Sequence, residues 1–375
     1  MTALTDRFRS LDVLRGLTIC LMIVVNTPGS GASAFAPLHH AHWFGCTPTD
    51  LVFPSFLFVV GNAMSFSMGK YEALGRRAVL AKIFRRTALI FLLGYLMYWF
   101  PFFRFDEAGH FAWKTIGDTR IMGVLQRIAL CYCAGALILE FFSKRTAVII
   151  SLCLLAGYWG LLYLFGEPGR QLTMTGNAVL RLDLWLFGPR HLYHGEGIAF
   201  DPEGVLSTLP AIVNVIAGYL AGDYIRRKGK THECVATLMV WGVVLISVAL
   251  LWSLSFPMSK KIWTSTFVVY TVGIDLAVIG VLIYLLDLKR WTRGVAFFEI
   301  FGRNPLFIYL LSELLVVVLF MIPVGGTSFF EWINQVVFQV VAPGPVGSLL
   351  FALCYMLLCW AVGYWLNRRR IYVRI

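Results

Sequence analysis

Apolar runs long enough to cross a membrane recur along the whole chain of 375 residues. A helix needs about 20 predominantly apolar residues to span the hydrocarbon core. Ten segments meet this requirement, at approximately 11–27, 51–68, 87–103, 121–142, 146–165, 206–222, 235–256, 264–286, 304–322 and 348–367. The shorter and more polar stretch 329–342 predicts a re-entrant or interfacial segment. The pattern therefore predicts an all-α fold, a polytopic membrane helix bundle.

The composition supports this fold class. Hydrophobic residues make up 59% of the chain and charged residues 14%, with a mean hydropathy of +0.75. In an ordinary soluble domain the apolar fraction is lower, and about a quarter of the residues are charged. The chain has no hydrophilic stretch long enough for a separate domain, so residues 1–375 are expected to form one transmembrane domain. Asp12 and Arg15 interrupt the first apolar run, which favours an uncleaved helix over a signal peptide.

The basic residues predict the orientation in the membrane. With a cytoplasmic N-terminus, the cytoplasmic segments carry 22 of the 32 Lys and Arg residues and the opposite loops carry 8, the other two lying within spans. Cytoplasmic loops are enriched in Lys and Arg, so both termini are predicted to be cytoplasmic. The net charge of +12 comes from short blocks between spans. We therefore expect contact with the lipid bilayer and no nucleic-acid binding.

The loop after the first span carries the densest group of titratable residues. Its sequence PLHHAHWFGCTPTDLVFP contains three of the chain's seven histidines, His39, His40 and His42, ahead of Asp50. The predicted topology puts this loop on the extracytoplasmic side, where it has no Lys or Arg. A titratable cluster at the end of a membrane span is a candidate functional site.

Three interpretations of this cluster are open. The histidines could bind a metal, although adjacent histidines on a loop have no recognised zinc spacing and the eight cysteines form no CxxC pair. They could be interfacial residues beside Trp43. One of them could be a general base or nucleophile, because histidine accepts a proton near neutral pH and Asp50 could fix its tautomer.

Charged residues within the spans need partners. Asp12 and Arg15 are three residues apart and can pair, either as a structural ion pair or as the rim of a site for an anionic ligand from the cytoplasm. Arg120 and Arg127 are two helical turns apart and are expected on one face of the fourth span.

Arg127 is deep enough in the fourth span to require a partner of its own. The partner could be a carboxylate such as Asp275 or Glu313, or the phosphates or carbonyls of a ligand. The sequence does not decide between these interpretations, because it does not say which helices touch.

Four asparagines lie in or at the ends of apolar helices, namely Asn26, Asn62, Asn214 and Asn304. Such amides commonly join helices through hydrogen bonds, and they can also bind a substrate. Asn26 is the strongest functional candidate, because it ends the first span where the histidine loop begins.

Five runs of sequence carry a family resemblance, between Arg9 and about Glu313. They are RSLDVLRGLTICLMIVVNTPG, HHAHWFGCTPTDLVFPSFLFVVG, RIMGVLQRIALCY, FDPEGVLSTLPAIVNVIAG and FGRNPLFIYLLSE. In this order they resemble the transmembrane acetyltransferase family of heparan-alpha-glucosaminide N-acetyltransferase. The chain looks like a short bacterial-type member of that family, and the resemblance implies an integral protein of the bacterial inner membrane.

The resemblance implies a reaction and a catalytic histidine. In the family, acetyl-CoA from the cytosol acetylates the amino group of a terminal glucosamine across the membrane. The family's active histidine lies in a motif of the form His-Ala-x-Trp-x-Gly followed by Asp-Leu-Val-Phe-Pro, which selects His40 and matches Asp50. The asparagine that ends the preceding helix matches Asn26, and Glu203 falls in the family's Asp-Pro-Glu-Gly element.

The residues and the resemblance together give one mechanistic hypothesis. His40, with Asp50, takes a proton from the acceptor amine, and Asn26 donates to the developing oxyanion. The remaining site predictions are cofactor-binding roles for Arg15, Arg120, Arg127 and Asn304, and substrate-binding roles for His42, Trp43 and Glu203. An acetyl-histidine intermediate and direct transfer both remain open.

The expected partners are acetyl-CoA and an amino sugar of the glucosamine type, without a metal ion, and a homodimer is an open alternative to a monomer. The leading rival function is a transporter of amino sugars or N-acetylglucosamine. The chain shows no matching pair of short, Gly- or Pro-broken spans in its two halves, which is the usual sign of a transport site.

Overall fold

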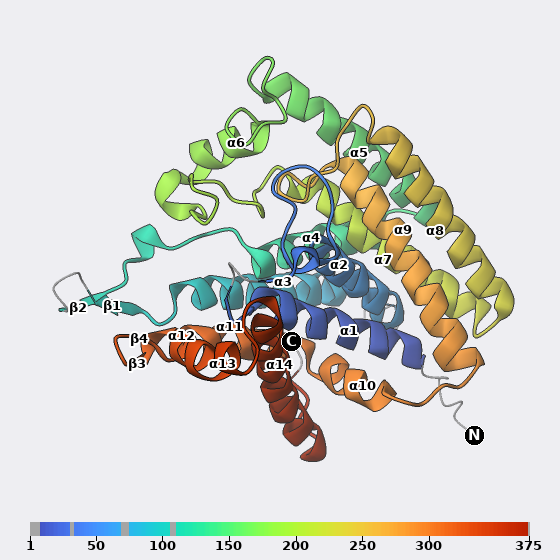
Figure 1. Cartoon of the computed structure of the whole chain (residues 1–375). Coiled ribbons are helices and arrows are strands. Elements are labelled where there is room, and N and C mark those ends of the chain that lie inside the picture. Colours follow the sequence, from blue (N-terminus) through green and yellow to red (C-terminus); the bar gives the residue numbers. More distant parts are fainter. Residues whose placement is uncertain (1–7, 31–33, 69–74, 106–109, 374–375) are drawn as a thin grey trace.

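The computed structural model describes residues 8–30, 34–68, 75–105 and 110–373 and is predominantly helical (Figure 1). A helix covers each of the ten predicted spans. These helices are α1 (Arg9–Asn26), α2 (Pro48–Ser67), α3 (Arg76–Trp99), α4 (Val124–Phe141), α5 (Lys144–Phe165), α7 (Thr208–Lys228), α8 (His232–Trp252), α9 (Ser265–Leu282), α11 (Pro305–Met321) and α14 (Pro345–Arg368). A π-helical turn, Ile283–Leu288, extends α9. The all-α bundle is confirmed.

Fewer than ten of these helices are both long enough and apolar enough to cross a membrane by themselves. Among the described residues, seven helices are long and apolar enough, and an eighth span results if α10 (Val295–Arg303) and α11 are counted together. These two meet at an angle of 83°. The break falls at Asn304, because Pro305 opens α11 and has no backbone N–H to continue a helix. The count of ten spans and the cytoplasmic termini stay predictions.

The prediction that Arg120 and Arg127 share one face of the fourth span is wrong. The fourth span begins only at Val124, so Arg120 lies in the preceding loop and does not share a helix face with Arg127. Gly123 has an extended backbone and packs against the ring of Tyr98, where a Cβ atom would lie only 2.3 Å from the ring. The chain therefore reaches α4 in extended form before the helix starts.

The stretch 329–342 is helical in short pieces, α12 (Phe329–Ile333), a π-helical turn (Asn334–Phe338) and α13 (Gln339–Val341). Phe330 is buried and stacks on Phe320 of α11, with ring centroids 4.4 Å apart, and meets Phe351 of α14 at 4.7 Å. The segment therefore packs on two long helices, and its entry into the membrane remains a prediction.

Helix α2 lies in the centre of the bundle and packs closely on α7. A Cβ atom on Gly61 would lie 1.8 Å from the Val215 carbonyl oxygen, and one on Gly218 would lie 1.9 Å from the Phe58 carbonyl oxygen. Glycines let two helix backbones approach in this way, which is a common packing mode in membranes. This contact fixes the position of α2, whose first turn carries Asp50.

The loops that the charge pattern predicts on one side do meet at one end of the bundle, at the left in Figure 1 and away from the N-terminus. Gly45 N–H donates to the Met258 carbonyl (2.8 Å), and Ile121 N–H donates to the His191 carbonyl (3.2 Å).

We call this end of the bundle, where the loops meet, the loop end. The short secondary-structure elements of the fold lie there. They are the hairpin β1 (Phe103–Phe105) with β2 (Phe111–Trp113), the hairpin β3 (Pro323–Val324) with β4 (Thr327–Ser328), α6 (Ala178–Phe187), and 3-10 turns at Ala36–Leu38, Ile116–Asp118 and Pro189–His191.

Candidate active site

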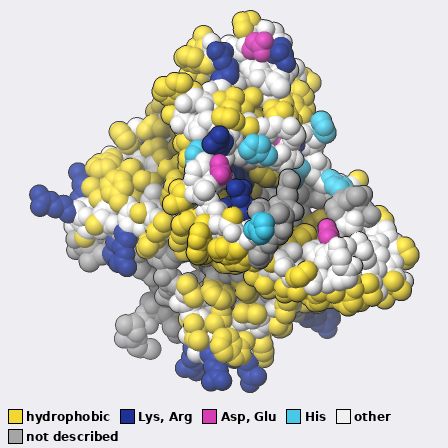
Figure 2. All heavy atoms as spheres, turned by 90° about the vertical axis from the view of Figure 1, so that its left-hand side faces the viewer, with side chains coloured by type: hydrophobic (Ala, Val, Ile, Leu, Met, Phe, Trp, Pro, Cys, Tyr) yellow, Lys and Arg dark blue, Asp and Glu magenta, His cyan; other side chains and the backbone are white. Residues whose placement is uncertain are grey.

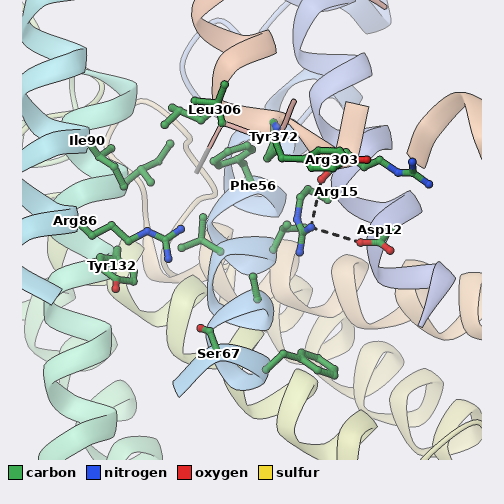
Figure 3. Close-up of a pocket in the computed structure, with 18 of the residues that line it drawn as sticks. Asp12, Arg15, Phe56, Ser67, Arg86, Ile90, Tyr132, Arg303, Leu306 and Tyr372 are labelled. Carbon is green, nitrogen blue, oxygen red and sulfur yellow. Dashed lines mark hydrogen bonds and ion pairs between the residues drawn. The ribbon is translucent and has the colours of Figure 1, made fainter. Parts of the chain in front are cut away.

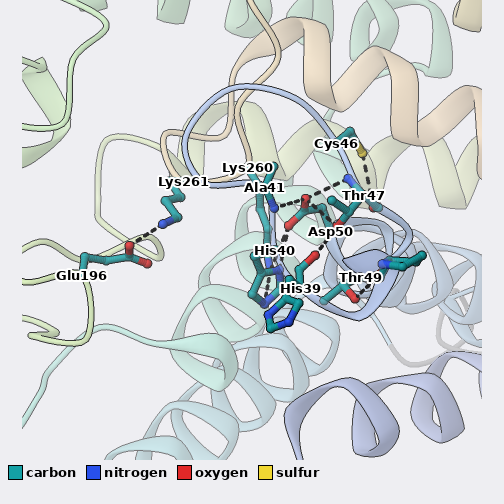
Figure 4. A network of polar contacts seen from close by, with 11 residues as sticks. His39, His40, Ala41, Cys46, Thr47, Thr49, Asp50, Glu196, Lys260 and Lys261 are labelled. Carbon is teal, nitrogen blue, oxygen red and sulfur yellow. Dashed lines mark hydrogen bonds and ion pairs between the residues drawn. The ribbon is translucent and has the colours of Figure 1, made fainter. Parts of the chain in front are cut away.

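The carboxylate of Asp50 organises the histidine loop (Figure 4). Asp50 lies in the first turn of α2, and one of its oxygens, Oδ2, accepts from the backbone N–H groups of Thr47 (2.9 Å) and Ala41 (3.0 Å) and from the Thr47 hydroxyl (3.0 Å). This is a capping box, a usual way to begin a helix. The other oxygen, Oδ1, lies 2.7 Å from Nδ1 of His40. Helix capping thus also fixes the imidazole.

The contact with Asp50 decides which nitrogen of His40 faces a substrate. A carboxylate accepts hydrogen bonds, so it favours the tautomer with the proton on Nδ1. The other nitrogen, Nε2, then presents a lone pair. The side chain of His40 is 45% exposed, whereas that of Asp50 is 1% exposed, so the imidazole is accessible and its partner is not. This is the geometry of a general base or nucleophile with a buried orienting carboxylate.

A cavity of about 130 Å³ lies beside this pair, at the ends of α1, α2 and α4. It brings together Asn26, His40 and Glu203, three of the residues that the sequence predicts in the site. The rest of its wall is formed by Met22, Val25, Thr49, Val52, Phe53, Val124 and Lys260. We call this space the small cavity.

Lys260 is the site residue that the sequence predictions missed. It lies in the loop between α8 and α9, and its Nζ is 3.1 Å from Nδ1 and 3.3 Å from Nε2 of His40, and 3.9 Å from Oδ1 of Asp50. Burial lowers the pKa of Lys260, while the carboxylates of Asp50 and Glu203 act in the opposite direction. A signal existed in the sequence, because lysines are scarce on the predicted extracytoplasmic side.

Glu203 is held in the small cavity by Arg120. The Arg120 guanidinium donates to both oxygens of Asp201 (2.9 and 2.7 Å) and to Oε2 of Glu203 (2.6 Å), and it lies 4.9 Å from the ring of Tyr98. Burial alone would raise the pKa of Glu203, but the charges of Arg120, Arg127 and Lys260 hold it below its usual value. The charge of Arg120 thus favours the ionised form of Glu203, and its predicted role toward the cofactor stays untested.

The two carboxylates that the sequence offers as partners of Arg127, Asp275 and Glu313, bind other groups. Asn26 donates through Nδ2 to Glu313 (3.2 Å), and Asp275 accepts from Ser55 (2.5 Å), so neither carboxylate pairs with Arg127. Arg127 is fully buried and donates instead to the carbonyl of Gly204 (3.0 Å) and the hydroxyl of Ser207.

The other N–H groups of the Arg127 guanidinium are buried without an acceptor in the part of the chain that the structure describes. Its Nε and Nη1 lack a hydrogen-bond partner among the described residues, while its guanidinium lies 4.9 Å from the ring of Trp263. The interpretation that Asp275 or Glu313 neutralises Arg127 is therefore wrong, and a ligand partner remains untested.

The neighbours of His40 have other positions. The imidazole of His39 lies 3.1 Å from the Ala34 carbonyl, and His42 is exposed. The indole of Trp43 donates to the Leu172 carbonyl (2.7 Å), which ties the histidine loop to the long loop before α7. Among the described residues, no three His, Cys, Asp or Glu side chains gather in a group that could hold a metal ion.

A second and larger cavity, about 730 Å³, lies further along the same helices (Figure 3). Arg15 and Arg86 point into it from α1 and α3, and Arg303 contributes from the end of α10. The predicted pairing of Asp12 with Arg15 is present at 3.5 Å. Most of its other lining residues are apolar, so it combines positive charge with hydrophobic surface, as many cofactor sites do. We call this space the basic cavity.

Asn304 lies beside the basic cavity rather than facing it. Its Nδ2 donates to the Ile371 carbonyl (3.0 Å), and its Oδ1 accepts from the N–H of Val373 (2.8 Å). Tyr372 and Val373 line the basic cavity, so Asn304 holds the C-terminal segment in its wall.

The two cavities follow the same three helices. The small cavity touches α2 at Val52 and Phe53, and the basic cavity begins at Phe56, one turn further; on α4 the boundary lies between Val124 and Leu125. Figure 2 shows the loop end of the molecule, where His, Lys or Arg, and Asp or Glu side chains surround a hollow near the centre of the face.

Comparison with known proteins tests the resemblance. Residues 7–188 match the family model described as "Heparan-alpha-glucosaminide N-acetyltransferase, catalytic". The chain is 29% identical over 367 residues to the human heparan-alpha-glucosaminide N-acetyltransferase, covering 84% of this chain and 54% of the human protein. It is 28% identical over 364 residues to the Mus musculus protein of the same name, covering 83% and 54%.

This chain spans about half the length of these curated relatives. The segment that matches the family model contains the whole histidine loop, whereas Glu203 and Lys260 lie beyond it. Both relatives are named as N-acetyltransferases, a class of enzyme. The resemblance to the heparan-alpha-glucosaminide N-acetyltransferase family, predicted from the sequence motifs, is thereby confirmed.

Proposed function

We propose that this integral membrane protein is an N-acetyltransferase. It would move an acetyl group from cytoplasmic acetyl-CoA to the amine of a glucosamine-type sugar on the extracytoplasmic side. The observation that carries the proposal is the hydrogen-bonded pair of His40 and Asp50 beside a cavity that follows the basic cavity along α1, α2 and α4. The names of the relatives supply the acceptor class. The long apolar helices support an integral membrane protein, and the bacterial inner membrane is the location that we propose for it.

The basic cavity fits the donor. Arg15 and Arg86 offer positive charge for phosphates, and charged donors bind phosphate oxygens through strong, directional hydrogen bonds. From Arg15 to Asn26 the first helix advances about 16 Å at 1.5 Å per residue. An extended pantetheine arm reaches over a distance of this order. The thioester would then arrive in the small cavity while the nucleotide stays at the arginines.

The small cavity fits the chemistry. Nε2 of His40 would take the proton that the acceptor amine loses as its nitrogen bonds to the thioester carbonyl carbon. Asp50 would stabilise the resulting imidazolium, and Asn26 would donate to the carbonyl oxygen as negative charge develops there. The C–S bond then breaks and CoA leaves as a thiolate that takes up a proton. A covalent route through acetylated His40 needs the same residues.

The acceptor would enter from the loop end. Glu203 lines the small cavity and could accept hydrogen bonds from sugar hydroxyls or the ammonium group, and exposed His42 lies on the same loop as His40. Trp43 would shape the entrance, because its indole is held on Leu172 and its ring packs against Phe200 at 5.6 Å.

The decisive experiment measures CoA release from acetyl-CoA by the purified full-length protein, with and without glucosamine. We expect glucosamine-dependent release that His40→Ala abolishes and that the matched variant His39→Ala retains. Equal release by the protein and by His40→Ala would overturn the proposal. Uptake of labelled glucosamine into proteoliposomes without acetyl-CoA would instead favour the transporter.

A further inference from the structure

Two adjacent lysines in the loop between α8 and α9 have opposite surroundings (Figure 4). Lys261 forms an ion pair with Glu196 of the long loop before α7. Lys260 lines the small cavity, its side chain is only 15% exposed, and its Nζ lies beside both nitrogens of the His40 ring. The proposed function gives Lys260 no role, although it touches the reacting group.

The hydrogen bonding of His40 fixes what Lys260 can do there. The N–H group at Nδ1 of His40 donates a hydrogen bond to Oδ1 of Asp50 (2.7 Å), so Nε2 carries no proton and keeps its lone pair. An ammonium group has three donors and no acceptor. Nζ lies 3.1 Å from Nδ1 and 3.3 Å from Nε2, so the ammonium group stands beside the ring between the two nitrogens. Its N–H donors are therefore within reach of a group that reacts at Nε2, while the lone pair of Nε2 stays open to the substrate.

Burial lowers the pKa of Lys260, and two neighbouring carboxylates favour its ammonium form. Asp50 lies 3.9 Å from Nζ, and Glu203 lines the same small cavity. Two nearby carboxylates oppose the effect of burial, which by itself disfavours a charged lysine. A cation held in a partly dehydrated site interacts more strongly with a developing negative charge than it would in water.

We propose that Lys260 is a catalytic residue that donates a hydrogen bond to the oxyanion of the tetrahedral intermediate, a role that rests on the proposed acetyl transfer. Attack at the thioester carbonyl carbon forms a C–N bond and moves the C=O electron pair onto oxygen. In the covalent route the acetyl carbon is bonded to Nε2, and in direct transfer the attacking amine nitrogen lies next to Nε2. In both routes the carbonyl oxygen would lie near Nζ of Lys260. When the carbonyl reforms, the C–S bond breaks and the thiolate leaves with the electron pair.

The matched pair Lys260→Met and Lys261→Met tests this role in the full-length protein, by steady-state CoA release with glucosamine. Loss of one oxyanion donor typically lowers kcat by about 10²–10³-fold. We expect that loss for Lys260→Met, with the KM for acetyl-CoA unchanged within about twofold. Lys261→Met should keep kcat within about threefold, and Lys260→Arg, which retains the charge, should recover at least about tenfold over Lys260→Met.

The outcomes separate this inference from the proposed function. If the unmodified protein releases no CoA, the acetyl transfer fails and the role of Lys260 fails with it. If the protein is active, His40→Ala is inactive and Lys260→Met keeps kcat, only the role of Lys260 is overturned. A rise in KM at constant kcat also overturns it, because it shows ground-state binding alone. If Lys260→Met does not bind acetyl-CoA as a folded protein, Lys260→Gln replaces it with the same criteria.

Discussion

The two cavities of this protein hold their polar groups in different ways. In the small cavity, His40, Asp50 and Lys260 hydrogen-bond or ion-pair with one another, and Asp50 is anchored further by backbone N–H groups. In the basic cavity, Arg15 pairs with Asp12 and Arg303 with Glu299, but the Nε atoms of Arg86 and Arg303 are buried and have no hydrogen-bond partner among the described residues.

This difference indicates which cavity is suited to the chemical step and which is suited to binding an anion. A polar network fixed before substrate arrives costs no reorganisation during reaction, which suits a site for chemistry. Buried guanidinium groups with unused donors are costly unless a ligand supplies acceptors, which suits a site for an anion. The small cavity should therefore control kcat, and the basic cavity should control the affinity for the donor.

The largest expected effect comes from Asp50→Asn in the small cavity. The amide still accepts hydrogen bonds at the helix start, but its NH₂ group faces Nδ1 of His40, which favours the wrong imidazole tautomer and leaves an imidazolium without a counter-charge. We expect kcat to fall by roughly 10³–10⁴-fold. Steady-state CoA release measures it.

The control for this change is Asp12→Asn in the basic cavity, which should leave kcat within about threefold, because Asp12 pairs with Arg15 and does not line the small cavity. A kcat of Asp50→Asn within about tenfold of the unmodified protein would show that the carboxylate does not orient the base.

A smaller effect, and of the opposite kind, is expected from Arg86→Gln in the basic cavity. Loss of one charged hydrogen bond to a phosphate costs about 1.5–3 kcal/mol, so the KM for acetyl-CoA should rise at least about tenfold with kcat nearly constant. The matched control is Arg85→Gln, because Arg85 is exposed on the same helix and outside the cavity lining. An unchanged KM with a reduced kcat would contradict the division between the cavities.

The sequence predicted the parts of the site that depend on motifs and helix ends. Asn26, His40 and Glu203 line one cavity. The end of the first span indicates Asn26, and the family resemblance indicates His40 and Glu203. The bundle itself follows from apolar run length. The pairing of Asp50 with His40 is likewise local, since ten residues separate them.

The missed parts depend on contacts between distant segments. Lys260 reaches His40 across 220 residues of sequence, through a loop whose path only the folded bundle defines. The sequence predicts for Arg127 either a carboxylate or a ligand as its partner, whereas its guanidinium donates to the Gly204 carbonyl, a contact that no residue pattern indicates. Arg120 was placed on a helix because an apolar run does not reveal the extended backbone at Gly123.

The smallest expected effect concerns a buried carboxylate that contacts Gly204 and Val205, next to Glu203 in the chain. Asp183 of α6 is buried, its Oδ1 accepts from the Val205 N–H (3.0 Å), and its Oδ2 has no hydrogen-bond partner among the described residues. Burial raises the pKa of Asp183 to about 7. The folded state therefore keeps the proton where the unfolded chain has lost it, and stability should fall as pH rises from about 4 to about 7 and then level off.

Asp183→Asn removes this titration and keeps the acceptor for Val205. The difference in Tm between the variant and the unmodified protein should therefore grow in favour of the variant from pH 5 to pH 7, by a few degrees, and stay constant above pH 7.5. Thermal unfolding in one detergent over this range measures it, with the exposed Glu167→Gln as the control. A difference that does not vary with pH would mean that Asp183 is ionised in the folded protein. A buried carboxylate without a cationic partner among the described residues would then lie beside the segment that carries Glu203, in contrast to Asp50, which has hydrogen-bond partners on both oxygens.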